Sequence, residues 1–257
     1  MTRMALSPSR AAEYRQCPLR YRLRAIDRVP EDGDDTAAVR GTITHRHLDE
    51  VYDVPAGHRV TLLRVQGDAY QAFADDVGAC REAAIAEGVA DGLHGYLQVE
   101  EPDLLDPHVR EHRFEVTLAG VPVRGVIDRV DAAPIGHRVV DYKTGRAPRE
   151  QWEAKAWWQL RLYACVLRAR GLDPVRLRLV YLRPSEVLDL DVTDADLDRF
   201  ERTLPPLWAA IVKAGQTGHF PPRTSRLCGW CGLHALCPAQ GGTPPPYPGW
   251  PDDQEDA

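Results

Sequence analysis

The sequence lacks the long apolar runs that mark membrane-spanning and exported proteins. No stretch approaches the roughly 18 uninterrupted apolar residues that a spanning helix requires, and the start of the chain, Met1 to Leu6, has no apolar leader. A Gly-x-x-x-x-Gly-Lys segment, which would bind the phosphates of a nucleotide, is also missing. We therefore expect a cytoplasmic protein with no membrane contact and no helicase motor of its own, so that any helicase partner is a separate protein.

The chain also lacks an excess of positive charge, which at first argues against a polyanionic partner. Its formal net charge is −6, but acidic residues are concentrated at 31–35 and 252–256, and the eight carboxylates there exceed the whole deficit. Residues 1–30 carry seven Arg against two acids, and residues 137–183 carry eleven Lys or Arg against four acids. DNA binding therefore stays open, although any single Arg in these segments is more simply explained as part of a solvated helix face.

Cysteine is present, but its pattern does not indicate a disulfide framework. Cytosolic thiols are kept reduced, so the spacing of the six cysteines indicates their use. Cys80 and Cys165 stand alone in helical patterns, and we expect both to be buried thiols of the core.

The spacing of apolar residues changes along the chain. A helical period predicts helices at about 7–24, from about 41 onward, and over roughly 64–94. Alternation then predicts strands, with helices between and after them: strands at 111–118, 121–131 and 137–143, a helix at about 150–170, strands at 176–182 and 187–192, and a helix at 194–214. This order predicts an α/β protein.

Two of the predicted strands end in carboxylates. Asp128 follows Val126 and Ile127, and Asp141 follows two valines and precedes Lys143 by two residues. A charge in such an apolar strand is costly unless it is paired or bound to a cation, and residues two apart share one face of a strand. Two hard oxygen ligands beside an ammonium suit a Mg²⁺ or Mn²⁺ phosphodiesterase site. The plainer interpretation is an ion pair between Asp141 and Lys143 on an edge strand, which an isolated Asp-x-Lys would favour.

The surrounding residues resemble the RecB-like branch of the PD-(D/E)xK nuclease superfamily. In that branch a G-x-x-D strand precedes a D-x-K strand and then a helix with Q-x-x-x-Y. This chain has the same order: Gly125 to Asp128, Asp141 to Lys143, and Gln159 with Tyr163. The resemblance covers nearly the whole chain. It implies a restriction-endonuclease-like core, in which a mixed central sheet is flanked by helices, with helical additions.

The resemblance also implies roles for the matching residues. Asp128 and Asp141 would be metal ligands, Lys143 the catalytic lysine, and the backbone carbonyl of Tyr142 an additional ligand. A helix histidine in a G-x-x-x-H pattern completes the metal site in the family, and Gly41 to His45 match that pattern. We therefore expect His45 to be a metal ligand.

Other polar residues near these motifs receive weaker assignments. Gln159 and Tyr163 lie one helical turn apart, and the resemblance implies that they border the site and contact DNA. Arg129 is expected to face a phosphate or to be an ordinary surface arginine. His47 is expected to be structural or exposed, whereas Glu115 and Asp131 are expected to be structural or to support the site from behind its ligands.

The remaining cysteines have a metal-ligand spacing near the C-terminus. Cys228-x-x-Cys231-x5-Cys237 supplies three ligands, which do not close a tetrahedral site. Cys17, which lies 211 residues before Cys228, is the natural fourth ligand. From spacing alone, Zn²⁺ and an iron–sulfur cluster are equally acceptable, and His234 is an available substitute ligand.

This arrangement of one plus three cysteines resembles the iron–sulfur staple of AddB-type and CRISPR-associated members of the same superfamily. The resemblance implies a [4Fe–4S] cluster that joins the two ends of the nuclease domain. Trp230, between two of the ligands, would either shield the cluster or stack on a base. The resulting domain prediction is one nuclease domain over 1–242, with a helical part at about 36–100, a core at about 108–192 and a cluster segment at about 215–240, followed by a disordered acidic, Pro-rich tail at 243–257.

The implied activity is that of a Mg²⁺- or Mn²⁺-dependent exonuclease that hydrolyses phosphodiester bonds at single-stranded DNA ends, with 5′ to 3′ polarity favoured. One alternative is a CRISPR-adaptation nuclease that trims DNA ends with an integrase partner, and the same motifs would serve it. Two non-hydrolytic alternatives are a DNA-binding iron–sulfur module and a redox-sensing iron–sulfur protein. The intact Asp128, Asp141 and Lys143 argue against a module that has lost cleavage.

Overall fold

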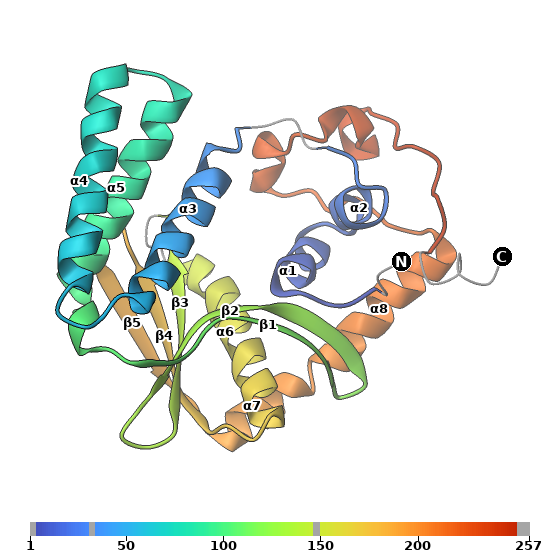
Figure 1. Cartoon of the computed structure of the whole chain (residues 1–257). Coiled ribbons are helices and arrows are strands. Elements are labelled where there is room, and N and C mark those ends of the chain that lie inside the picture. Colours follow the sequence, from blue (N-terminus) through green and yellow to red (C-terminus); the bar gives the residue numbers. More distant parts are fainter. Residues whose placement is uncertain (1–3, 31–33, 146–149, 251–257) are drawn as a thin grey trace. The chain divides into compact units, whose positions relative to one another are not determined.

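A computed structural model describes residues 4–30, 34–145 and 150–250 of the chain (Figure 1). Residues 31–33 of the first acidic segment and the whole of the second, at 252–256, lie outside the described residues. Within the described parts, no helix combines the length and apolar character needed to cross a membrane.

The chain divides into two compact units, and each unit is built from separate segments. The unit that we call the cysteine unit comprises Met1–Gly33, Phe114–Gly125 and Asp198–Ala257. The other, which we call the sheet unit, comprises Asp34–Arg113 and Val126–Leu197. The prediction of a single domain stays a prediction.

Three long helices open the sheet unit. They are α3 (Thr36–Glu50), α4 (Arg59–Val77) and α5 (Arg81–Val99), with 3-10 turns at Val51–Asp53 and Pro102–Leu104. The single helical region predicted at 64–94 is two helices that run side by side (Figure 1). Gly78 separates them with a φ of +69°, which favours glycine.

Cys80 corrects one prediction and Cys165 confirms another. Cys80 is exposed, and it is the N-cap of α5, where its sulfur accepts a hydrogen bond from the Ala83 N–H at 3.3 Å. The expectation that Cys80 is a buried thiol is therefore wrong. Cys165, on α6, is buried as predicted.

The strands form one five-stranded sheet in the order β1-β2-β3-β4-β5. Their bounds are β1 (Pro107–Leu118), β2 (Val121–Ala132), β3 (His137–Lys143), β4 (Pro174–Tyr181) and β5 (Glu186–Asp191). The β3 and β4 strands are parallel, whereas the β2–β3 and β4–β5 pairs are antiparallel. The parallel pair requires a crossover, which α6 (Glu150–Ala169) supplies. A mixed central sheet flanked by helices confirms the predicted fold class.

Strand β3 lies at the centre of the sheet, and its alternation assigns residues to opposite faces. Val140 and Tyr142 pack into the apolar core with residues of α3 and α5, whereas Asp141 and Lys143 bond to Gln159 of α6. Helix α5 approaches closely because it is glycine-rich. A Cβ at Gly95 would lie 1.8 Å from the Leu182 carbonyl oxygen, so there is no room for a side chain at this position.

The cysteine unit contains the short helices α1 (Pro8–Gln16) and α2 (Pro18–Tyr21) and a π-helical turn at Arg22–Ile26. The one helix predicted at 7–24 is therefore interrupted at Cys17, whose φ of −157° and ψ of 108° are extended. Pro18 is the reason, because the residue before a proline is disfavoured in the helical conformation. The helix predicted at 194–214 is likewise two helices, α7 (Asp194–Glu201) and α8 (Leu204–Thr217).

The prediction that disorder begins at residue 243 is wrong for residues 243–250. Trp250 is 3% exposed, and its ring lies where a Cβ on Gly215 would be 2.0 Å away. The Tyr247 hydroxyl donates to the Gly215 carbonyl at 2.8 Å. Two aromatic side chains thus hold a Pro-rich segment on α8, although its composition indicates disorder. Residues 251–257 lie outside the described part.

Candidate metal site and cysteine site

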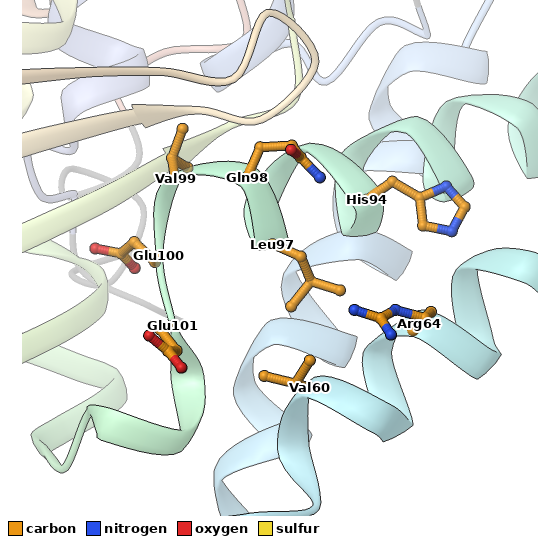
Figure 2. Close-up of a pocket in the computed structure, with 8 residues that line it drawn as sticks. All are labelled: Val60, Arg64, His94, Leu97, Gln98, Val99, Glu100 and Glu101. Carbon is orange, nitrogen blue, oxygen red and sulfur yellow. The ribbon is translucent and has the colours of Figure 1, made fainter.

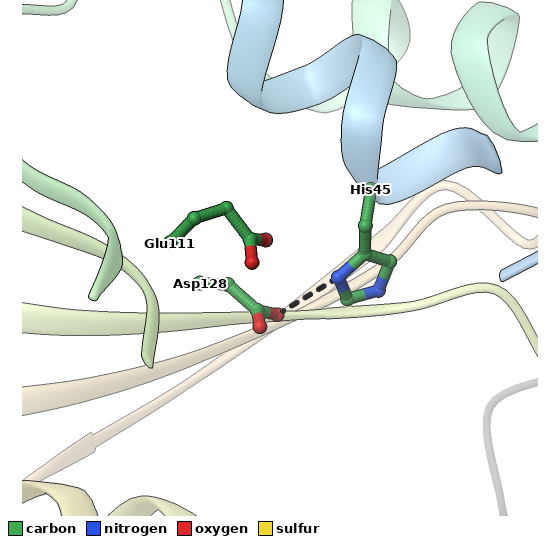
Figure 3. Close-up of side chains that lie close together, drawn as sticks. All are labelled: His45, Glu111 and Asp128. Atoms are coloured by element: carbon green, nitrogen blue, oxygen red, sulfur yellow. Dashed lines mark ion pairs between the residues drawn. The ribbon is translucent and has the colours of Figure 1, made fainter. Parts of the chain in front are cut away.

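Three potential metal ligands from three elements of the sheet unit lie close together (Figure 3). His45 comes from α3, Glu111 from β1 and Asp128 from β2, and one ligand atom of each lies within 4.8 Å of the others. The closest printed approach is 3.5 Å, between His45 Nδ1 and an Asp128 carboxylate oxygen. Carboxylates with one imidazole form a donor set that suits a divalent cation such as Mn²⁺ or Mg²⁺.

Glu111 is the member of this set that the sequence interpretation missed. It has the unusual φ of +39° for a residue other than glycine, and backbone strain of this kind concentrates at functional sites. Motif and periodicity do not distinguish it from Glu115, four residues later on the same strand, which is exposed. Only the path of β1 places Glu111 beside Asp128, so the sequence offered no signal that could have found it.

The peptide of Tyr142 joins His45 and Asp128. Its N–H donates to Asp128 Oδ2 at 2.8 Å, and its carbonyl oxygen lies 3.2 Å from His45 Nε2. The carbonyl that was predicted to be an additional metal ligand thus faces the same histidine. Both of its bonds are made by the backbone, so they depend on the position of β3 and not on the Tyr142 ring.

The electrostatic field of this site favours a positive charge. Burial opposes a charge on the His45 ring, but the Asp128 carboxylate, with Asp141 and Glu111 around it, raises the pKa of His45 to about 9. Burial and the Asp128 carboxylate also raise the pKa of Glu111 above its ordinary value. With acceptors at both ring nitrogens, His45 is an imidazolium at neutral pH in the metal-free protein.

Asp141 and Lys143 form a second group on the α6 side of β3. Lys143 Nζ lies 2.5 Å from Asp141 Oδ2 and 3.0 Å from Gln159 Oε1, and Gln159 Nε2 donates to Asp141 Oδ1 at 2.7 Å. Burial raises the pKa of Asp141 to about 6, and the Lys143 ammonium opposes that rise. The ion pair of the plainer interpretation is present, but it lies on the central strand and not on an edge. Asp141 lies outside the set formed by His45, Glu111 and Asp128.

Gln159 and Tyr163 are joined to each other as well as to this group. Gln159 Nε2 donates to the Tyr163 hydroxyl at 2.8 Å. Tyr163 is 4% exposed, so it is buried where DNA contact was expected, whereas Gln159 is partly exposed. In this structure Tyr163 orients Gln159 and presents no surface to a nucleic acid.

Arg129 requires a full correction, because it is not at the surface. It is 1% exposed and forms two bonds to Glu100, at 2.6 and 2.8 Å, and an ion pair with Asp131 at 2.9 Å. The predicted phosphate contact is therefore wrong. Asp131 also pairs with Arg138 at 2.7 Å, in agreement with its predicted structural position. His47 bonds to the Tyr70 hydroxyl at 3.0 Å, which likewise agrees with a structural position.

A hollow elsewhere on the sheet unit contains none of the candidate metal or catalytic residues. It has a volume of about 490 Å³ and is lined by Val60, Arg64, and residues 94 and 97–101. Figure 2 shows the Glu100 carboxylate directed away from Arg64 and His94. Glu100 bonds instead to the buried Arg129.

The cysteine unit brings together the four cysteines singled out by their spacing. They line one small cavity of about 40 Å³, together with His234: Cys17, Cys228, Cys231 and Cys237. The Arg223 N–H donates to Cys17 Sγ at 3.4 Å, and the Ser225 N–H donates to Cys228 Sγ at 3.3 Å.

An apolar cluster packs beside these thiols. Its buried members are Leu19, Leu23 and Leu233. Trp230 is 89% exposed and does not line the cavity, so it does not shield the thiols.

A central mixed sheet that carries carboxylates and a lysine on β2 and β3, with a histidine of α3 beside them, defines a class of nuclease folds. The chain matches the PD-(D/E)XK nuclease superfamily over residues 5–238, and it belongs to that superfamily. The match spans both compact units.

The chain is similar to two solved structures at low sequence identity, and only the first of them exceeds a TM-score of 0.5. The crystal structure of a proposed exonuclease from Eubacterium rectale is 13% identical, with 88% of this chain and 86% of that chain covered and a TM-score of 0.54. The crystal structure of the protein SSO0001 is 18% identical, with 81% of this chain and 98% of that chain covered and a TM-score of 0.39. No curated protein matches the chain.

Proposed function

We propose that this protein is a divalent-metal-dependent deoxyribonuclease of the RecB-like branch, and that it acts as an exonuclease on single-stranded DNA ends. The observation that carries the proposal is the convergence of His45, Glu111 and Asp128 beside the ion pair of the buried Asp141 with the partly exposed Lys143. The name of the Eubacterium rectale relative supports the exonuclease assignment. We propose 5′ to 3′ polarity on the family resemblance alone.

The donor set fits Mg²⁺ or Mn²⁺. His45, Glu111 and Asp128 would hold the ion, and the Tyr142 carbonyl and Asp141 are the additional oxygen donors nearby. The same field that raises the pKa of His45 to about 9 would favour a divalent cation in place of the proton. When bound, such an ion polarises the phosphate and lowers the pKa of water.

Lys143 is the basic group of the D-x-K pair on β3. Its ammonium, held by Asp141 and Gln159, would position the attacking water and offset the negative charge that develops on the phosphate. Gln159 orients both Asp141 and Lys143, so it would keep the ammonium at a fixed distance from the reacting phosphorus. Removing the charges of such a pair from water costs free energy, and this cost supports a functional role for the pair.

We further propose that the four cysteines hold a [4Fe–4S] cluster. The four cysteines line one small cavity. The N–H donors to two of the sulfurs and the apolar cluster beside them support a buried metal group, and the family resemblance favours iron–sulfur. The exposed Trp230 is then available to stack on a base.

The test is cleavage of end-labelled single-stranded DNA by anaerobically purified protein with Mn²⁺ or Mg²⁺. We expect metal-dependent release of the label, and a rate reduced at least about hundredfold by Lys143→Ala and by Asp141→Ala. Lys213→Ala, on the exposed surface of α8, is the matched control and should cleave normally. Early release of a 5′ label in short products would establish the polarity.

The same experiment can reject the proposal. If the wild-type protein binds DNA and retains its cluster absorbance, but cleaves no form of DNA with either metal, the chain is a binding module. Loss of cleavage in the Lys213→Ala control would show that the loss in the other variants is not specific to the site.

A further inference from the structure

The Tyr142 side chain ends in a buried polar network on the face of the sheet opposite Asp141. Arg129 Nη1 donates to three tyrosine hydroxyls: Tyr142 at 2.5 Å, Tyr96 at 3.2 Å and Tyr52 at 3.3 Å. Tyr52, Tyr96 and Tyr142 are at most 8% exposed. The guanidinium is therefore the point at which three elements of the sheet unit meet.

Acids hold this guanidinium firmly in place. Glu100 accepts two of its bonds at 2.6 and 2.8 Å, and Asp131 lies 2.9 Å from its Nε. Arg178 pairs with Glu100 at 3.3 Å, and Arg138 with Asp131 at 2.7 Å, so both acids are fixed from their other side. A bidentate carboxylate gives Arg129 both position and orientation. The Tyr142 hydroxyl is thus bonded to a group that cannot easily move.

One residue connects this network with the candidate metal ligands. The Tyr142 N–H bonds to Asp128, and its carbonyl accepts from His45. Arg129 follows Asp128 directly in β2 and pairs across the sheet with Val140 of β3. The network therefore acts on both strands at the point where each contributes to the site.

We propose that Tyr142 is a positioning residue, whose hydroxyl, held by Arg129, fixes the peptide that orients Asp128 and His45 for a divalent cation. This inference rests on the proposed function and adds a buried device that sets the geometry of the ligands. Groups that orient metal ligands from behind typically change metal affinity when they are removed. A buried ionic network is weak evidence for a stabilising role. Its direct connection to the metal ligands instead indicates a role in positioning them.

The chain provides a matched control for this role. The Tyr96 hydroxyl also accepts a hydrogen bond from Arg129, and the Tyr96 side chain is as buried as that of Tyr142. Its backbone, however, lies in α5 and not in β3, whose peptide bonds to His45 and Asp128. Changing either tyrosine to phenylalanine removes one hydroxyl from Arg129 and keeps the ring. Only the change at Tyr142 releases the residue whose peptide holds the ligands.

The experiment measures binding of Mn²⁺ alone, without DNA, to wild type, Tyr142→Phe and Tyr96→Phe by electron paramagnetic resonance titration. We expect Tyr142→Phe to weaken Mn²⁺ binding roughly tenfold, and Tyr96→Phe to change it less than about twofold. In cleavage assays, Tyr142→Phe should raise the Mn²⁺ requirement and lower kcat, while the KM for DNA stays unchanged. Thermal unfolding of both variants shows whether the loss of a hydroxyl has affected folding equally.

Equal weakening in the two variants would show that the network is only structural and would overturn the inference, while the proposed function would stand. If wild type binds no Mn²⁺, the proposed function fails and the inference with it. Arg129→Lys provides a second variant, because it keeps the charge against Glu100 but loses the fork that reaches Tyr142. It should weaken Mn²⁺ binding as Tyr142→Phe does, and unchanged binding would again contradict the inference.

Discussion

Two neighbouring residues of β2 have opposite surroundings: Asp128 lies with the candidate metal ligands, whereas Arg129 is buried against Glu100 and Asp131. The ends of the two apolar strands and the two-residue spacing predict Asp128, Asp141 and Lys143 as a group. Arg129 could not be predicted as buried, because its counter-charge Glu100 lies 29 residues away in the chain. Its second acid, Asp131, is two residues away and therefore on the same strand face, which was the one local indication.

Glu111 provides the first residue-scale prediction. Glu111→Gln removes a charged oxygen donor from the candidate metal site, so we expect Mn²⁺ affinity and cleavage to fall by about 10- to 100-fold. Glu115→Gln, an exposed change on the same strand, should leave both unchanged. Calorimetric titration with Mn²⁺ measures the affinity. Normal Mn²⁺ binding by Glu111→Gln would show that Glu111 is not a metal ligand.

The second residue-scale prediction concerns pH. The pKa of His45 is raised to about 9 in the folded protein. The charged His45 ring therefore stabilises the metal-free protein fully at pH values below about 6.5, the pKa of histidine in the unfolded chain. That stabilisation is lost as the pH rises through about 9.

A metal ion must displace this proton from His45. We therefore expect Mn²⁺ affinity to increase about tenfold per pH unit between about 7 and 9. Asp141 does not interfere, because its pKa of about 6 lies below this window. Titrations at several pH values, with His45→Gln as the control that should flatten the dependence, provide the measurement. A wild-type affinity independent of pH would contradict this role of His45.

At the scale of elements, the periodicity of apolar residues predicts most helices and strands, and the errors lie where one residue decides the backbone. Pro18 ends the first helix at Cys17, and Gly78 divides α4 from α5. A helical period continues through both points, because it averages over several residues. The C-terminal segment was missed for another reason: composition does not show that Trp250 finds a partner at Gly215.

Trp250 leads to a prediction about the cysteine unit. Trp250→Ala removes a buried ring that packs against Gly215 of α8, and truncations of this kind destabilise a protein by about 3–5 kcal/mol. Trp230→Ala is the matched control, since that side chain is 89% exposed and its loss should cost little. Urea unfolding of the two variants measures the difference in the free energy of unfolding. Equal midpoints would mean that residues 243–250 do not contribute to the stability of this unit.

At the scale of the whole molecule, segments far apart in the chain share a unit, and local patterns cannot reveal this. Leu6 forms a parallel bridge with Val123, so the tip of the β1–β2 hairpin belongs with the N-terminal residues. The four cysteines lie at both ends of the chain and within one unit, whereas every candidate metal and catalytic residue lies in the other. This separation predicts that the two sites respond independently to substitution.

Cys17→Ser tests that separation together with the cluster. Anaerobically purified wild type should contain about four iron atoms and four sulfides per chain, and the variant should lose them. Because a structural metal group contributes folding energy, the cysteine unit should become sensitive to protease. Mn²⁺ binding by the sheet unit should be kept, because none of its ligands comes from the cysteine unit. Cys80→Ser, at the exposed N-cap of α5, is the control and should retain its iron. One zinc per wild-type chain would contradict the iron–sulfur cluster. Loss of Mn²⁺ binding in Cys17→Ser together with the cluster would contradict the independence of the two sites.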